Sequence, residues 1–89
     1  MGSFKGWELE AVEPDVRLDV RDGRWPLLWV RAQLVLEQMH PGQILELDVA
    51  DSAALEELPD RASKHGCHLL KVEAPDGEFG FRVWLERRA

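Results

Sequence analysis

The sequence has little cysteine, no tyrosine and no long apolar run. Its single cysteine, Cys67, cannot form an internal disulfide, which excludes a secreted scaffold held together by disulfides. One cysteine also cannot complete a zinc site without histidines. No apolar run approaches the roughly 20 residues that span a bilayer. The first residues, MGSFKGWELEAVEP, lack the apolar core of a signal peptide. We therefore expect a cytoplasmic protein with no membrane partner.

Basic residues are also in the minority. Eleven Lys and Arg against seventeen Asp and Glu give a net charge of −6. Nucleic-acid binding needs clustered Lys and Arg that contact phosphates, so we expect no nucleic-acid partner. The sequence has no paired carboxylates, Ser-His-Asp arrangement or phosphate-binding glycine loop in a suitable context, so neither a conventional enzyme nor a bound cofactor is expected.

The spacing of apolar residues predicts four strands and two helices. Alternation predicts strands over residues 16–21, 43–49, 67–73 and 79–86. A period of 3.6 residues predicts a helix from Pro26 to Met39, and the residues on its inward face are Trp29, Ala32, Leu36 and Met39. A second helix is expected from Asp51-Ser52 to about His65, with Asp51 or Ser52 as its cap and Pro59 bending or dividing it.

This order, βαβαββ, predicts an α+β fold in a single domain of 89 residues. Right-handed crossovers place both helices on one face of a four-stranded mixed sheet, which makes a two-layer sandwich. The other face stays open, which explains the alternation within the strands. The domain covers residues 16–89, and residues 1–15 form either a leader or an extra edge strand.

Short segments between residues 18 and 82 match the order and spacing of a known family. They are Leu18-Asp19-Val20-Arg21, Trp25-Pro26, His40-Pro41-Gly42-Gln43, Asp51-Ser52, Leu58-Pro59, Gly66 with Leu69-Leu70, and Phe81-Arg82. Their combined spacing resembles the TusA/SirA-like sulfur-carrier family. The resemblance implies the same βαβαββ sandwich. It also implies a sulfurtransferase role, in which a cysteine at the start of the first helix relays sulfur between proteins as a persulfide.

The motif that carries this chemistry departs from the family pattern. Where the family has Cys-Pro-x-Pro, this chain has Trp25-Pro26-Leu27-Leu28. A thiolate suits a helix N-terminus because the helix dipole and the free N–H groups lower its pKa. Trp25 has no thiol and cannot carry a persulfide. The sequence therefore predicts a protein that binds a partner in a sulfur-relay-related context without carrying sulfur at this position.

Cys67 leaves an alternative open, in which its thiol carries sulfur instead. If the first three strands run in one direction, Cys67 lies at the opposite pole of the domain from position 25, which favours a small buried hydrophobe. The group His65, Cys67 and His68 matches no established zinc spacing, so solvated residues are favoured over a metal site. A small-anion or metal-binding regulator is a third interpretation.

An apolar strip with basic neighbours is the candidate partner-binding surface. The strip consists of Trp25, Leu27 and Leu34, and its basic neighbours are Arg21, Arg24 and Arg31. Leu27 and Leu34 lie two helical turns apart, on a different face from Trp29, and exposed apolar patches often mark interfaces. Alternatively, the helix packs more deeply or residues 1–15 cover the strip. Arg21 and Arg24 also suit a small anion at the helix N-terminus.

Trp84 is a possible second contact. It alternates with Val83 and Leu85, so we expect it on the open face of the sheet. Either Trp7 or Leu9 folds over it, or it contacts a partner or a second copy of the chain in a homodimer.

Overall fold

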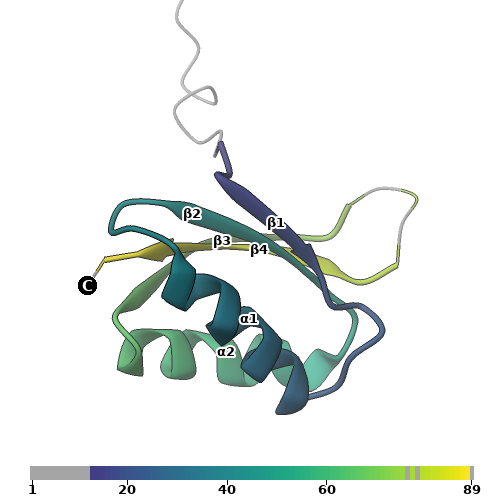
Figure 1. The fold of residues 1–89 in the computed structure, drawn as a ribbon. Helices are drawn as coiled ribbons and strands as arrows, with labels where there is room; N and C mark the ends of the chain where they lie inside the picture. Colours follow the sequence, from purple (N-terminus) through teal and green to yellow (C-terminus); the bar gives the residue numbers. More distant parts are fainter. Residues whose placement is uncertain (1–12, 76, 78, 89) are drawn as a thin grey trace, which may run out of the picture.

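The structure is a computed structural model and describes residues 13–75, 77 and 79–88. The elements are β1 (Val16–Asp19), α1 (Leu27–Gln38), β2 (Ile44–Val49), α2 (Ser52–Lys64), β3 (Cys67–Glu73) and β4 (Phe81–Arg87). In the sheet the strand order is β1-β2-β4-β3; β1 and β2 are parallel, and β4 is antiparallel to both of its neighbours. Both helices lie on one face of the sheet (Figure 1). The predicted α+β sandwich is confirmed.

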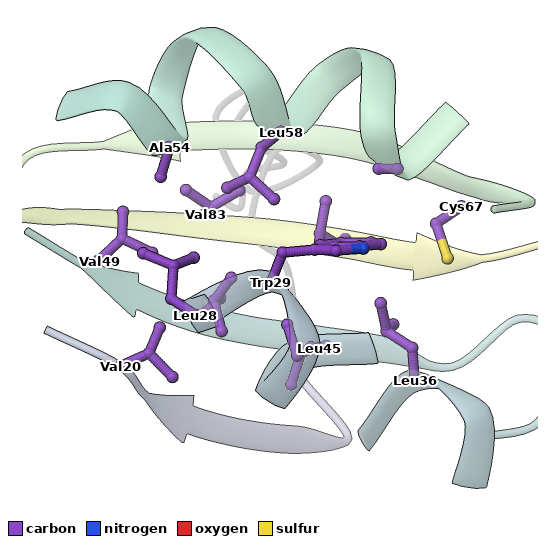
Figure 2. Close-up of a cluster of buried hydrophobic side chains, with 14 of the residues drawn as sticks. Val20, Leu28, Trp29, Leu36, Leu45, Val49, Ala54, Leu58, Cys67 and Val83 are labelled. Atoms are coloured by element: carbon purple, nitrogen blue, oxygen red, sulfur yellow. The ribbon is translucent and has the colours of Figure 1, made fainter. Parts of the chain in front are cut away.

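A layer of apolar side chains fills the space between helices and sheet (Figure 2). All four residues that the helical period placed inward, Trp29, Ala32, Leu36 and Met39, are buried. The sheet contributes alternate residues, because successive side chains of a strand point to opposite faces. These residues are Leu45, Leu47, Val49, Val83 and Leu85. The helical and strand periods in the sequence therefore identified most of the core.

In two strands one boundary falls two residues inside the predicted range. β1 ends at Asp19 and not at Arg21, because the backbone N–H of Arg21 donates a hydrogen bond to the Asp19 carboxylate, at 3.0 Å. β4 begins at Phe81 and not at Phe79. Before it, Gly80 has a φ of +96°, and a Cβ there would lie 2.5 Å from the carbonyl oxygen of Val49. Only glycine allows this approach, and Phe79 is left exposed outside the sheet.

α2 runs unbroken from Ser52 to Lys64 with Pro59 inside it. Of the two effects predicted for Pro59, division of the helix is wrong, and a bend stays a prediction. Leu58 and Ala62, one on each side of the proline, are fully buried, so both halves of the helix are held on the core. The predicted cap at Asp51 is confirmed, since its Oδ1 accepts a hydrogen bond from the Ala53 N–H at 3.0 Å.

Trp84 lies on the sheet face opposite to the helices, as its alternation predicts. Its Nε1 donates to Glu46 Oε1 at 3.1 Å, and Lys71 Nζ lies 5.1 Å from its ring centroid. The side chain is only 6% exposed. Most of the predicted leader or edge strand, including Trp7 and Leu9, lies outside the described residues. The predicted contact of Trp7 or Leu9 with Trp84 therefore lies outside the described residues as well.

Candidate partner-docking site

Trp25 lies in the connection between β1 and α1, where a single carboxylate holds its backbone. Asp51 Oδ2 accepts a hydrogen bond from the Trp25 N–H at 2.8 Å, while Oδ1 of the same side chain caps α2. The hydrogen bond from Trp25 and then that from Ala53 lower the pKa of Asp51. The carboxylate is therefore charged at neutral pH and ties the start of α1 to the start of α2.

The sequence identifies Asp51 only as a helix cap. Its second hydrogen bond joins residues 26 positions apart, so no local pattern signals it. This bond also bears on the predicted anion site, because Asp51 already places a negative charge beside the start of α1. Arg21 is one of the two arginines expected to bind the anion. Its side chain instead donates to both oxygens of the Asp19 carboxylate, at 3.0 and 2.8 Å. The geometry therefore offers little support for a small-anion site here.

The ring of Trp25 packs between the two helices. Its centroid lies 6.4 Å from that of Trp29, and the guanidinium carbon of Arg61 lies 5.5 Å from it. Both distances are typical of favourable aromatic and cation–π contacts. Trp25 is half-buried. Part of this side chain therefore stabilises the helix pair, and the rest forms part of the surface.

The apolar strip of α1 faces solvent. Leu27 is 71% exposed and Leu34 is 61% exposed, so the deeper packing considered for this helix does not occur at either position. Val30 is 48% exposed and lies between them, three residues after Leu27. Val30 is not among the residues predicted for this strip, although the same helical spacing places it on this face.

The basic residues around the strip are partly neutralised. Arg21 pairs with Asp19, and Arg31 Nη1 lies 3.1 Å from Asp22 Oδ1. Hydrogen bonds from the side chain and the backbone of Arg21 lower the pKa of Asp19 to about 2. Arg24 is exposed and has no ion pair within residues 13–75, 77 and 79–88. The rim therefore carries both signs of charge instead of the purely basic set that the sequence suggested.

Cys67 lies at the end of the sheet opposite to the one where Trp25 follows β1. β3 runs in the same direction as β1 and β2, since β2 and β3 are both antiparallel to β4, and Cys67 is the first residue of β3. Its side chain is 7% exposed, with Sγ 3.7 Å from the carbonyl oxygen of His65. Burial raises the pKa of the thiol, although the positive charge of Arg87 lowers it in part. A buried thiol with a raised pKa has little thiolate at neutral pH, and the thiolate is the nucleophile.

The neighbouring histidines do not build a metal site with this thiol. Nowhere in the described part of the chain are three or more His, Cys, Asp or Glu side chains grouped so as to hold a metal ion. His65 Nδ1 lies instead 3.0 Å from the carbonyl oxygen of Arg61.

Neither α1 nor α2, the two helices among the described residues, is long and apolar enough to cross a bilayer.

Comparison with known proteins places this arrangement in a family. A model of the sulfurtransferase TusA matches residues 16–86, from the first strand into the last. The chain belongs to the TusA family. A relative from Archaeoglobus fulgidus that carries the name "Putative sulfur carrier protein" is 26% identical over 81 residues, which cover 91% of each chain. In this TusA-family protein, Trp25 stands where the sequence motif of the family leads one to expect the sulfur-carrying cysteine.

Proposed function

We propose that this TusA-family protein docks a partner protein of a cytoplasmic sulfur-relay system without carrying a persulfide itself. The observation that carries the proposal is the exposure of Leu27 and Leu34, at 71% and 61%, on the helix that starts beside Trp25. A residue without a thiol cannot form a persulfide, yet the surface around it remains apolar. Large apolar side chains grouped on a rigid helix are typical of protein interfaces.

The proposed docking surface consists of Trp25, Leu27, Val30 and Leu34, with Arg21, Arg24 and Arg31 at its edge. The apolar residues supply the area that a partner would cover, and Trp25 supplies a ring of the kind that often dominates binding energy. The Asp19–Arg21 and Asp22–Arg31 pairs leave the edge close to neutral. Trp84, at 6% exposure, offers a partner little area and is not part of this surface.

A pull-down that compares two variants of the docking surface with one control variant tests the proposal. Leu27→Glu combined with Leu34→Glu places charges in the proposed apolar centre, and recovery of a bound partner should fall by about tenfold or more. Trp25→Ala should weaken recovery as well. The control is Val72→Glu, because Val72 is 45% exposed on the edge strand β3 and lies outside the surface. Circular dichroism establishes that each variant is folded.

Two results of this experiment count against the proposal. In one, the double variant recovers its partner as well as the wild-type protein does. In the other, Val72→Glu loses the partner to the same extent, which would show a general effect of added charge.

A sulfur carrier that uses Cys67 is the competing function. It has less support, since the Cys67 thiol is buried and its pKa is raised. Incubation with a cysteine desulfurase and labelled cysteine, followed by intact-mass measurement, separates the two functions. We expect no sulfur on the protein. Sulfur that appears on the wild-type chain and disappears in Cys67→Ser would establish the competing function instead.

A further inference from the structure

A cleft lies beside the second half of α1, away from Leu27. Its volume is about 170 Å³, and its lining consists of Trp29, Gln33, Leu36, Glu37, His65, Cys67 and Arg87. For comparison, an apolar cavity of roughly 150 Å³ holds a benzene molecule. The cleft therefore has room for one six-membered ring.

One atom in its wall points to a ligand. Trp29 is only 2% exposed, yet its Nε1 has no hydrogen-bond partner, and among the described residues it is the one buried side-chain nitrogen or oxygen in that state. Buried donors in proteins nearly always have an acceptor. In Figure 2 the indole extends toward Cys67, with its nitrogen near that end of the ring. The cleft thus presents a donor that lacks an acceptor.

His65 lies against the ring that carries this donor. Its ring packs edge-on against Trp29, with the centroids 5.3 Å apart, and its side chain lies at the exposed end of α2. Because Nε1 is itself covered, an acceptor can reach it only if a neighbouring side chain moves. The exposed His65 ring contacts the indole, and turning it aside would break the 3.0 Å contact of its Nδ1 with the carbonyl oxygen of Arg61. An exposed side chain changes rotamer within picoseconds to nanoseconds, so this opening needs no movement of the backbone.

The charges of the lining favour a neutral ligand. Glu37 and Arg87 have opposite signs, and Nη1 of Arg87 already donates to the carbonyl oxygens of Leu36 and Met39, at 2.7 Å each. Leu36 and the indole supply the apolar walls. We propose that the cleft binds a small neutral molecule with one ring and a hydrogen-bond acceptor, and that this acceptor takes the hydrogen bond of Trp29 Nε1. The inference does not depend on the docking proposal.

Three probes of one ring test this inference: benzamide, benzoate and toluene. The full chain has four Trp, and the indole N–H signal of Trp29 in a ¹⁵N-labelled sample is assigned by its loss in Trp29→Phe. Benzamide should shift this signal in a saturable way. It should bind about fivefold more tightly than toluene, because one net hydrogen bond has that order of effect. Benzoate should bind no more tightly than benzamide.

A matched pair of variants separates the hydrogen bond from the packing. Trp29→Phe, followed through the backbone N–H of Cys67, should bind benzamide only as tightly as toluene. Trp84→Phe is the same substitution on the opposite face of the sheet and outside the lining, and it should keep the wild-type affinity. If Trp29→Phe does not fold, the wild-type comparison of benzamide with toluene decides alone.

Three outcomes would overturn the inference. The first is no saturable shift with any probe. The second is equal affinity for benzamide and toluene in the wild-type protein. The third is tighter binding of benzoate than of benzamide, which would indicate an anion site in place of a neutral one.

Discussion

Two carboxylates shape the backbone around Trp25. Asp51 accepts hydrogen bonds from two N–H groups, at 2.8 and 3.0 Å, and so joins the beginnings of both helices. Asp19 binds the Arg21 side chain through both oxygens and also accepts its backbone N–H. The Asp19–Arg21 pair is largely exposed, so its contribution to stability is small. Its main effect is to end β1 and turn the chain toward Trp25.

The lowered pKa of Asp19 predicts a pH-dependent contribution to stability. Its value of about 2 in the folded state lies below the usual 3.8, so the unfolded state binds more protons between these values. The contribution is complete above about pH 4 and is lost as the pH falls through about 2. In urea unfolding, Asp19→Asn should be less stable than the wild-type protein at pH 7, and the difference should shrink at pH 2.

The control for this measurement is Glu56→Gln, at an exposed position of α2 that has no ion pair within the described residues. It should stay close to the wild-type protein at both pH values. A stability loss in Asp19→Asn that is as large at pH 2 as at pH 7 would contradict the role given to this carboxylate.

At the scale of elements, α2 shows that packing can override local preference. Pro59 has no N–H to donate, and its ring crowds the carbonyl group of Leu55 four residues earlier. Ala54, Leu58 and Ala62 are nevertheless fully buried along one face, which keeps the helix whole. The helix is not divided at Pro59 because the packing on either side, which the proline alone does not reveal, holds both halves on the core.

Replacing this proline should stabilise the protein. Alanine is better than proline in a helix interior by roughly 3 kcal/mol, and the freer unfolded chain takes back about 1 kcal/mol. Pro59→Ala should therefore raise the free energy of unfolding by about 1–2 kcal/mol in urea titrations. Glu56→Ala, one turn earlier and also exposed, should change it by less than about 0.5 kcal/mol. A destabilised Pro59→Ala protein would mean that the proline has a packing role.

The whole molecule depends on one core between two helices and one sheet. β2 lies inside this sheet, between β1 and β4, and Leu47 on it is fully buried. Single domains of this size usually unfold in one cooperative step. Removing side-chain atoms at the centre of the core should therefore destabilise all the helices and strands together.

Truncation at this central position should be costly. Leu47→Ala should lower the free energy of unfolding by about 3 kcal/mol, because it removes buried methyl groups and leaves a cavity. Circular dichroism and tryptophan fluorescence should follow the same urea transition. Leu27→Ala, at 71% exposure, should cost less than about 0.5 kcal/mol. Two separate transitions, or a similar loss at both positions, would contradict a single shared core.

By itself, the sequence determined the order of the elements, most of the core and the lack of a thiol at position 25. Helical and strand periods record which side of each element meets the core, and the identity of Trp25 needs no coordinates. Only the tertiary structure decided the strand order, the bond from Trp25 to Asp51, the burial of Cys67 and the unpartnered Nε1 of Trp29. Each of these depends on contacts between residues far apart in the chain, which no local pattern records.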